Sequence, residues 1–359
     1  MTTEKYRCAI IGCGGRAHGH AKAYQLINRG VLVACANLSN AERLQKFALT
    51  YGITGYANAV EMIEKERPDL VHIVTMPDQW VLLMQMVSDL GVTACLVEKP
   101  IACGVEDWQE LCQLEARSET KFGVGKQFRW HPRMVDCRQA LRSGNLGDLL
   151  WINFFARMNL SAQGTHMIDW AMSLNDDSPV TQVFGNISGA GGFDSSYPAP
   201  NASVAQVMFA NGVCGLWSTG LTAPEIMDDS EIYKHTHVAG YAERGHVIFE
   251  EFGRWSISSP DDSRGGKISL EDRNRYNDMA QANLTNAMFQ WIENDAKPVE
   301  TNLKIALHQW NAVLGLYASS ICRQPIDVPF NPPDDLLLQL QTALEEEKLS
   351  NRTQKQKTE

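Results

Sequence analysis

The residue type that most clearly suggests chemistry is a lysine at the end of a short apolar segment, Cys95-Leu96-Val97-Glu98-Lys99-Pro100. A strand inside a parallel sheet is buried on both faces and is therefore continuously apolar. Ligands of open α/β sheets bind beyond the carboxyl ends of such strands, so we expect Lys99 at the mouth of a ligand site. Pro100 has no backbone donor and ends the strand. The alternative is a surface lysine after a strand, and the tripeptide alone does not exclude it.

A second candidate is the glycine-rich turn near the start of the chain. The apolar segment Tyr6 to Ile11 leads into Gly12-Cys13-Gly14-Gly15-Arg16-Ala17, a G-x-G-x-x-A turn before a helix expected to reach about Asn28. Gly12 allows the tight turn, Gly14 lets the backbone approach a pyrophosphate, and Ala17 keeps helix and strand close. The helix N-terminus offers free N–H groups to phosphates. This order of elements predicts a dinucleotide site, against the alternative of a tight turn without a ligand.

Two further expected strands end in residues that suit such a cofactor. After the strand Val31 to Ala36, Asn37 and Ser39 stand where an acidic residue usually holds the adenosine ribose. Asparagine can bond a ribose hydroxyl without repelling a 2′-phosphate, and no arginine follows directly, so NAD is favoured and NADP is not excluded. The strand expected at 70–75 ends beside Lys99, where the nicotinamide half would pass. The contacts expected there are Thr75, Met76, Pro77 and Trp80, although Trp80 is at least as plausible as a core aromatic.

These residues need a scaffold that gathers several strand ends. The expected strands alternate with helices, and the last strand before a change of pattern covers residues 121–127. The helices are expected at 41–51, 60–66, 80–90 and 105–118. Strands alternating with helices at this spacing predict a doubly wound parallel sheet, here a Rossmann domain over residues 1–129.

The pattern changes after Arg129 to strand following strand. A helix is expected at 131–142 and then strands, which favours an α+β domain over residues 130–345 with an open, mostly antiparallel sheet. The strands are expected at 149–158, 182–187, 204–209, 213–219, 236–241 and 246–249, later helices at 274–294 and 302–323, loops at 189–201 and 258–266, and a frayed, charged tail at 346–359. Apolar alternation from Gln182 to Thr219, with no second helical layer to cover it, predicts association of copies through this sheet.

In this second part, His166 and Asp169 are three residues apart on an expected helix that begins at Gly164-Thr165. Side chains at this spacing share one helical face. The alternative is a histidine at a helix start that packs under a loop.

Composition limits the class of protein. The 359 residues exceed one ordinary core and predict two domains. Nine cysteines without a Cys-x-x-Cys pair favour free thiols in a reducing compartment over disulfides or a metal site. A formal net charge of −10 argues against nucleic-acid binding. No apolar run could span a bilayer and no signal peptide is evident, so a cytoplasmic enzyme or small-molecule sensor is expected.

The chain resembles the Gfo/Idh/MocA family of nicotinamide-dependent oxidoreductases. The joint order of several motifs over most of the chain carries the resemblance, and no single motif is decisive. The motifs are Gly12-Cys13-Gly14-Gly15-Arg16, Glu98-Lys99-Pro100, Gln127-Phe128-Arg129-Trp130-His131-Pro132, Ser143-Gly144-Asn145-Leu146-Gly147, Gly164-Thr165-His166-Met167-Ile168-Asp169, and Ala318-Ser319-Ser320 with Gln324-Pro325-Ile326. The resemblance implies a Rossmann domain and a second domain whose open sheet forms dimers or tetramers.

The resemblance also implies an activity, hydride transfer between NAD(P) and a secondary hydroxyl of a sugar, inositol or related polyol. Lys99 would stabilise the developing alkoxide and His166 would move the hydroxyl proton. Asp169 would help to hold the polyol. Glu98 and Gln127 join the expected cofactor contacts, and Arg129, Arg157 and Tyr233 are candidate substrate contacts.

One position departs from the family pattern. Many of the family's dehydrogenases carry an aspartate four residues before the histidine, where this chain has Ala162 beside Gln163. A carboxylate there would orient the imidazole. Its absence keeps two other functions open: glycoside cleavage through transient oxidation by a tightly held NAD, and a non-catalytic regulator that binds the nucleotide.

Overall fold

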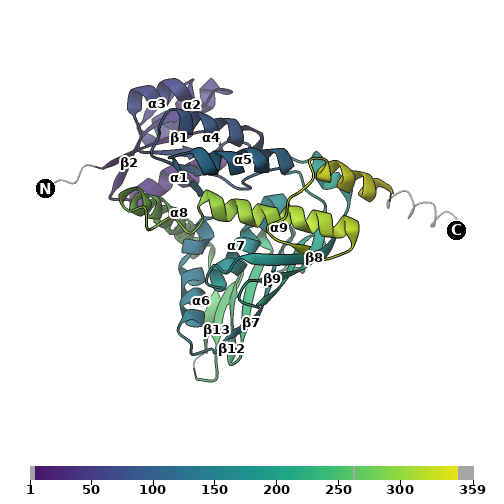
Figure 1. Ribbon diagram of the computed structural model, residues 1–359. Helices are drawn as coiled ribbons and strands as arrows, with labels where there is room; N and C mark the ends of the chain where they lie inside the picture. The colour runs from purple at the N-terminus through teal and green to yellow at the C-terminus, as the bar shows by residue number, and fades with distance from the viewer. Residues whose placement is uncertain (1–4, 262, 347–359) are drawn as a thin grey trace. The chain divides into compact units, whose positions relative to one another are not determined.

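A computed structural model describes residues 5–261 and 263–346 (Figure 1). Their contacts divide the chain into two compact units. Unit 1 comprises the described parts of Met1–Ile101, Gln109–His131 and Asn274–Leu307, and unit 2 comprises Ala102–Trp108, Pro132–Arg273 and the described part of His308–Glu359. The tail expected at 346–359 lies outside the described residues, except for Glu346, which is helical.

Unit 1 contains the parallel sheet that the alternation of strands and helices predicts. Its six strands lie in the order β3-β2-β1-β4-β5-β6, and every neighbouring pair is parallel. The strands are β1 Tyr6–Ile11, β2 Gly30–Ala36, β3 Thr54–Tyr56, β4 Leu70–Ile73, β5 Ala94–Val97 and β6 Lys121–Val124. Every residue of β4 and β5 is buried, because helices cover both faces of a doubly wound sheet. The doubly wound fold is thereby confirmed.

The helices between these strands begin and end at residues suited to those positions. Asn40 accepts a hydrogen bond from the Arg43 backbone N–H at 2.8 Å and caps α2, which ends at the left-handed Gly52. Asn58 caps α3 in the same way. The helices are α1 Gly15–Ala23, α2 Ala41–Tyr51, α3 Ala59–Glu66, α4 Trp80–Asp89 and α5 Val105–Arg117, with 3₁₀ turns at Tyr24–Leu26, Pro77–Gln79 and Gln127–Trp130.

A helix from far along the sequence completes the core of unit 1. The helix α8, Leu270–Glu293, contributes Met288 and Phe289 to the cluster that includes Cys8 and Ile10 of β1. The Phe289 ring stacks on Tyr6 with centroids 4.6 Å apart. Figure 1 shows α8 beside α1. A contact unit is not a folding domain, so the continuous ranges 1–129 and 130–345 stay a prediction about domains.

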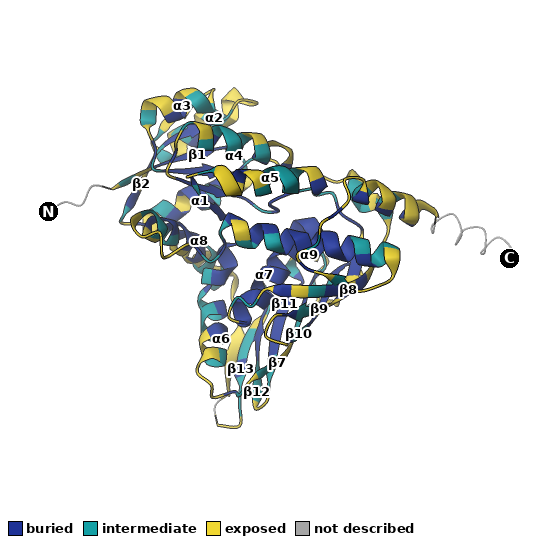
Figure 2. Ribbon diagram, in the orientation of Figure 1, coloured by how far each residue is buried: buried dark blue, intermediate teal, exposed yellow. Residues whose placement is uncertain are grey.

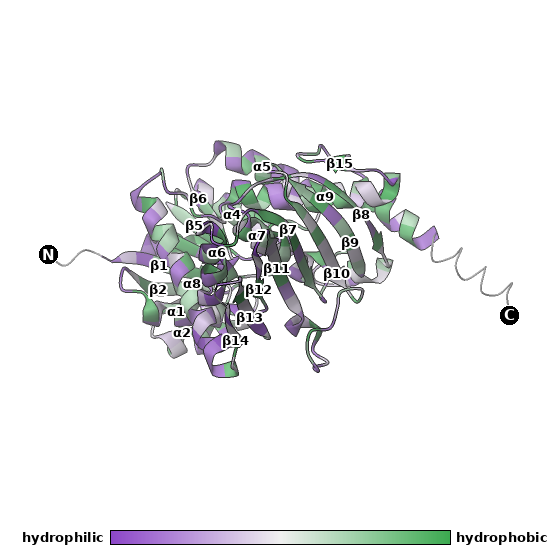
Figure 3. Ribbon diagram, turned by 90° about the horizontal axis from the view of Figure 1, so that it is seen from below, coloured by the Kyte–Doolittle hydropathy of each residue, from purple (hydrophilic) through white to green (hydrophobic). Residues whose placement is uncertain are grey.

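Unit 2 is built on a second sheet of nine strands, in the order β14-β13-β12-β11-β7-β10-β9-β8-β15. All neighbouring pairs are antiparallel except β7 with β10, which confirms an open, mostly antiparallel sheet. The strands are β7 Leu149–Ala156, β8 Val180–Ser188, β9 Ala202–Phe209, β10 Cys214–Gly220, β11 Thr236–Ala242, β12 Gly245–Phe249, β13 Arg254–Ser258, β14 Ser263–Lys267 and β15 Ile326–Asp327. Figure 3 shows the central strands side by side.

Helices of unit 2 cover one face of this sheet. The helix α7, Thr165–Leu174, packs against β7, β10 and β11, and every one of its residues is buried (Figure 2). It is accompanied by α6, Pro132–Arg142, and by the part of α9, Leu303–Cys322, that follows Leu307 and belongs to unit 2. On the strands the burial alternates, and the side chains that point away from α7 include exposed apolar ones: Phe184, Val204 and Leu216. Among the described helices, none combines the length and apolar character needed to cross a bilayer.

The expected loop at 258–266 is wrong in part. Ser258 ends β13, and β14 pairs antiparallel with it from Ser263 to Lys267. All five residues of β14, Ser-Arg-Gly-Gly-Lys, are exposed. A strand at the edge of a sheet can be held by backbone hydrogen bonds alone, so it lacks the apolar alternation by which strands are found in a sequence.

The place of α8 in the core leads to a prediction about stability. Phe289 is fully buried, so Phe289→Ala should lower the free energy of unfolding by about 3–5 kcal/mol, the usual effect of removing a buried aromatic side chain. A fragment of residues 1–131 should be less stable still, since it lacks the whole helix. Thermal and urea unfolding measure both effects. A fragment as stable as the full chain would contradict the place given to α8.

Candidate functional site

The strand ends of unit 1 gather the residues expected to bind a cofactor. Because all six strands are parallel, their carboxyl ends share one edge of the sheet. Gly12 follows β1, Asn37 follows β2, and Thr75 follows β4 by two residues. Glu98 and Lys99 follow β5 directly. The strand order runs outward in one direction from β1 to β3 and in the other from β4 to β6, and such a switch point is where ligands bind in open α/β sheets.

The glycine turn has the geometry of a phosphate cradle. Gly12 has a φ of +101°, and a Cβ at that position would lie 2.2 Å from the carbonyl oxygen of Val74, so only glycine fits. Gly14 differs, because a Cβ there would meet no atom of the residues described in the structure within 4 Å. The space above Gly14 is therefore open toward solvent at the N-terminus of α1, where backbone N–H groups are free to meet an anion.

A cavity of about 360 Å³ opens beside this turn in unit 1. Apolar side chains of α4 form one wall, and Gly12, Asn37, Ser39 and Thr75 contribute from the strand ends. Asn37 Nδ2 donates to the Asn40 carbonyl oxygen at 3.0 Å, so the amide oxygen is the atom available to a ribose hydroxyl. Among the described residues that line the cavity there is no lysine or arginine, which favours NAD over its 2′-phosphorylated form.

Other residues expected to contact the cofactor differ in exposure. Cys13 and Ala17 are buried behind the turn, and Pro77 is buried after β4. Met76 is 45% exposed. Trp80 is 1% exposed inside α4, so it occupies the core, the alternative that its position in the sequence left open.

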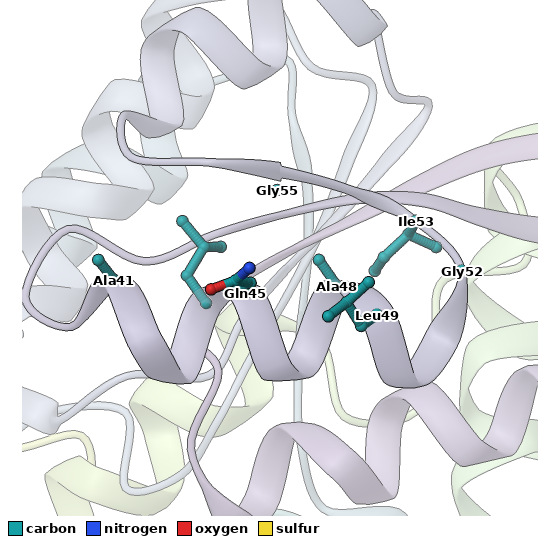
Figure 4. Close-up of a pocket in the computed structure, with 8 residues that line it drawn as sticks. Ala41, Gln45, Ala48, Leu49, Gly52, Ile53 and Gly55 are labelled. Atoms are coloured by element: carbon teal, nitrogen blue, oxygen red, sulfur yellow. The ribbon is translucent and has the colours of Figure 1, made fainter.

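A second hollow in unit 1 offers no such chemistry. It has a volume of about 400 Å³ and lies between α2 and β3 (Figure 4). Its lining is apolar apart from one amide and consists of Ala41, Leu44, Gln45, Ala48, Leu49, Gly52, Ile53 and Gly55. In the described part of the chain, none of the residues that line this hollow has a titratable or nucleophilic side chain.

Glu98 is held by two donors from α1. Its Oε1 accepts from Arg16 Nε at 2.8 Å and is 2.8 Å from His20 Nε2, and only 5% of the residue is exposed. The second nitrogen of the same guanidinium donates to Gln281 Oε1 on α8 at 2.7 Å. Arg16 therefore connects the nucleotide-binding turn with the end of β5, and both with α8.

The hydrogen bonds continue from Glu98 into the core of unit 1. His20 Nδ1 is 3.0 Å from His72 Nδ1, and His72 Nε2 is 2.7 Å from the hydroxyl of Tyr24. Both histidines are fully buried. Four side chains thus form a continuous path from the end of β5 through β4 to the 3₁₀ turn after α1. We call this path, Glu98–His20–His72–Tyr24, the buried polar chain.

Burial and charge set the protonation of this chain. Burial alone would raise the pKa of Glu98, but the Arg16 guanidinium and the His20 N–H lower it below its usual range, so the carboxyl group is ionised. Burial lowers the pKa of His20, and lowers that of His72 well below its ordinary value. Both imidazoles are therefore neutral near pH 7. Burial also raises the pKa of Tyr24, which keeps its hydroxyl protonated.

Sequence reasoning did not identify His20, His72 or Tyr24. A signal was present, because Arg16, His20 and Tyr24 are spaced by four and so share one face of a helix. That face would normally be apolar where it packs on a sheet. Their partner Glu98 lies 82 residues from Arg16, which no local pattern shows.

In unit 2, His166 and Asp169 both lie on α7. His166 is 6% exposed and Asp169 is fully buried. Asp169 Oδ1 accepts from Gln309 Nε2 of α9 at 3.0 Å, a contact that sequence reasoning also missed. Gln309 is itself 1% exposed, so the carboxylate is fixed in position by a buried amide.

The residues before His166 form a short π-helix, Leu160–Gly164, a geometry common at functional sites. Asn159 caps it by accepting from the Ala162 N–H at 2.9 Å. Ala162 is buried and brings no carboxylate. Gln163 Nε2 donates to the carbonyl oxygen of Tyr233 at 2.8 Å, so this amide is committed to the loop before β11.

The candidate substrate contacts lie in different surroundings. Arg129 belongs to unit 1, is fully buried, and lies 3.9 Å from Glu300. Arg157 of unit 2 donates to the Ala223 carbonyl oxygen at 3.0 Å and pairs with Glu225 at 3.1 Å. Tyr233 is 39% exposed.

Lys99 lies in unit 1 and His166 in unit 2. Within the described residues, no three His, Cys, Asp or Glu side chains are grouped to hold a metal ion.

Comparisons with known proteins agree with the chemistry of unit 1. Residues 6–126 match the model of a family described as "Oxidoreductase family, NAD-binding Rossmann fold". Over 151 residues, 42% of this chain, the sequence is 29% identical to D-apiose dehydrogenase of Paraburkholderia graminis, of which the match covers 40%. Over 155 residues, 43% of this chain, it is 23% identical to scyllo-inositol 2-dehydrogenase (NAD(+)) of Bacillus subtilis, covering 45% of that protein. The matches thus span less than half the length of these relatives.

Solved structures share the fold over most of the chain. An oxidoreductase from Agrobacterium radiobacter, in complex with NAD+, L-tartaric acid and magnesium, superposes with a TM-score of 0.76 at 16% identity. That similarity covers 90% of this chain and 98% of the other. A putative myo-inositol dehydrogenase from Sinorhizobium meliloti gives a TM-score of 0.72 at 19% identity, over 90% of this chain and 100% of the other. At these identities the likeness concerns the fold.

The two glycines of the turn predict opposite effects on substitution. Gly14→Val should leave the melting temperature nearly unchanged, because open space surrounds the position, yet should abolish NAD binding by filling the cradle. Gly12→Val should lower the melting temperature, since its Cβ would clash with Val74. Calorimetric titration with NAD and a thermal scan separate the two. Normal NAD affinity in Gly14→Val would refute the cradle.

The buried histidines predict a stability that falls in mild acid. Unfolded histidines take up a proton below about pH 6.5, whereas buried His72 stays neutral far below that value. Stability is therefore complete above about pH 6.5 and declines as the pH falls, by up to about 1.4 kcal/mol per pH unit for each proton. Melting temperatures between about pH 8 and pH 5.5 should fall less steeply in His72→Phe than in the wild type. Parallel curves would exclude a neutral, buried His72.

Proposed function

We propose that this protein is an NAD-dependent dehydrogenase acting on a sugar, inositol or related polyol, because residues 6–126 match the model of the Gfo/Idh/MocA oxidoreductase family, with its NAD-binding Rossmann fold. The observation that carries the proposal is the open glycine cradle beside a cavity whose described lining residues include no lysine or arginine. The names of the relatives supply the substrate class: one acts on D-apiose and another on scyllo-inositol.

The chain's own residues would hold the cofactor along the edge of the parallel sheet. The N–H groups at the start of α1 bind the pyrophosphate over Gly14. Asn37 and Ser39 accept and donate at the adenosine ribose, and Thr75 lies at the next strand end. NAD supplies a nicotinamide ring that takes up a hydride from the carbon of a secondary alcohol. Gln127 follows the last strand and completes this edge.

Two side chains divide the work on the substrate. Lys99, a cation at the end of β5, stabilises the negative charge that develops on the reacting oxygen. His166 removes the hydroxyl proton during oxidation and returns it during reduction, since imidazole titrates near neutral pH. Asp169 keeps the helix face beside His166 polar, and the hydrogen bond from Gln309 fixes the orientation of its carboxylate. Arg129, Arg157 and Tyr233 are the proposed contacts to the remaining hydroxyl groups.

One observation favours a second candidate, glycoside cleavage with no net redox change. Ala162 provides no carboxylate to His166, and the neighbouring Gln163 is bound to the Tyr233 carbonyl oxygen. Without a carboxylate partner, His166 is a weaker proton acceptor. This fits an enzyme that holds NAD tightly, oxidises its substrate transiently and then returns the hydride. Turnover without net NADH, in protein that keeps its nicotinamide absorbance through purification, would identify this reaction. A non-catalytic regulator is less favoured, because both Lys99 and His166 are present.

The setting of the reaction completes the proposal. All nine cysteines are free thiols in the structure, which suits the reducing cytoplasm. We also propose that copies associate as dimers or tetramers through the face of the nine-stranded sheet that carries Phe184, Val204 and Leu216.

The proposed reaction is tested by a substrate screen with NAD and NADP followed by substitution. His166→Ala should lower turnover by about two to four orders of magnitude, the usual contribution of one acid–base group, and leave NAD affinity nearly unchanged. Lys99→Ala should also lower turnover. Tyr51→Phe, a change remote from these residues, is the control. Near-normal turnover in His166→Ala would mean that another group moves the proton.

The proposed association predicts a change of size in solution. Light scattering at micromolar concentration should give at least a dimer for the wild type. Val204→Lys together with Leu216→Lys should produce monomers, because charges on paired strands cannot be buried between two sheets. Leu49→Lys, at a still more exposed apolar residue on α2, should have no effect. A monomeric wild type would contradict the interface.

A further inference from the structure

The buried polar chain has an order of protons that its geometry dictates. Ionised Glu98 can only accept, so His20 must carry its proton on Nε2 and donate it. Neutral His20 then has a lone pair on Nδ1, which obliges His72 to donate from its own Nδ1 across the 3.0 Å separation. The Nε2 of His72 is left as an acceptor, and Tyr24 donates to it. Every donor in the chain thus points toward Glu98.

This order excludes a role as a proton relay to Glu98. Moving one proton along the chain would neutralise Glu98, whose pKa is lowered, and ionise Tyr24, whose pKa is raised. Both changes are unfavourable. A chain of neutral donors that ends on a fixed charge instead holds that charge in one orientation, because each hydrogen bond polarises the next.

The surroundings of Glu98 allow it little freedom. A Cβ at position 125 would lie 2.9 Å from Glu98 Oε1, so the carboxylate packs directly on the backbone of the segment after β6. Gly125 N–H donates to the Val97 carbonyl oxygen at 2.7 Å, which fixes the same strand end from the other side. Arg16 adds its two hydrogen bonds, to Glu98 and to Gln281. The residue next in sequence to this immobilised group is Lys99.

We propose that His20, His72 and Tyr24 are positioning residues that couple the nucleotide-binding turn to Lys99 through Glu98. Arg16 and His20 belong to α1, whose N-terminus forms the phosphate cradle. Both donate hydrogen bonds to the carboxylate of Glu98, the residue that precedes Lys99. The turn and the lysine therefore move as one hydrogen-bonded body. Tyr24 lies at the far end of the buried polar chain. By donating to Nε2 of His72 it fixes the tautomer of His72, and through His72 that of His20. The inference rests on the proposed function for the role of Lys99.

A matched pair of substitutions separates coupling from mere stability. Tyr24→Phe removes one phenol hydroxyl bound to a histidine within the buried polar chain. Tyr51→Phe removes an equivalent hydroxyl, bound to His18 Nδ1 at 2.8 Å on the same helix α1 but outside the chain. Both variants keep their ring, so both should fold, which a thermal scan verifies. A purely structural network predicts similar behaviour of the two variants in every other measurement.

The first measurement is the acylation of Lys99 by acetic anhydride in the full chain, quantified by peptide mass spectrometry. Exposed Lys65 serves as the internal reference. In Tyr24→Phe the relative rate at Lys99 should rise about threefold to tenfold, the range that one lost hydrogen bond can transmit. In Tyr51→Phe it should stay within experimental error. Glu98→Gln should give an equal or larger change than Tyr24→Phe.

The second measurement is NAD affinity by calorimetry. Tyr24→Phe should weaken binding about threefold to tenfold, whereas Tyr51→Phe should not. His20→Gln, which keeps a donor able to reach Glu98, should be milder than His20→Leu. If a wild type that binds NAD shows equal acylation and equal affinity in the two tyrosine variants, the coupling is overturned and the proposed function stands. If the wild type fails to bind NAD, the proposed function is wrong. The acylation rates alone then decide whether the buried polar chain positions Lys99.

Discussion

A carboxylate removed from water must be met by donors, and in this protein that requirement is concentrated on Glu98. Breaking a buried ion pair by removing one partner costs about 3–5 kcal/mol. The donors that prevent this loss, Arg16 and His20, both come from α1. The need to satisfy one buried charge therefore brings the helix that faces the cofactor to the strand that ends at Lys99. The histidines and the tyrosine behind them follow from the same need, because each buried imidazole must itself be satisfied.

Much of this architecture could be inferred from local patterns. The glycine turn after an apolar strand marks the cradle, since Gly12 requires a backbone conformation that other residues rarely adopt. The strands β4 and β5 are buried throughout and apolar apart from His72, and this pattern reveals the parallel sheet in the same way. The asparagines that cap α2 and α3 indicate where those helices begin. Each of these signals is confined to a few neighbouring residues.

What escaped prediction depends on partners that are distant in the sequence. Glu98 meets Arg16 across 82 residues, and Gln281 meets the same guanidinium across 265. Asp169 and Gln309 are 140 apart. The edge strand β14 has no buried side chain, so burial leaves no trace in its sequence. At Ala162 the sequence shows that a carboxylate is missing. Only the structure shows that the neighbouring Gln163 donates a hydrogen bond to the Tyr233 backbone.

The place of α8 in the core of unit 1 has a consequence for how the protein is made. Ribosomes release the chain from its N-terminus, so β1 to β6 emerge well before the helix that packs against Tyr6 and Cys8. Residues 132–273 must be synthesised in between. At bacterial to eukaryotic elongation rates this delay lasts on the order of ten seconds. During that interval the nascent nucleotide-binding sheet exposes the surface that Phe289 later covers, which makes it a natural client for chaperones that shield apolar surface during translation.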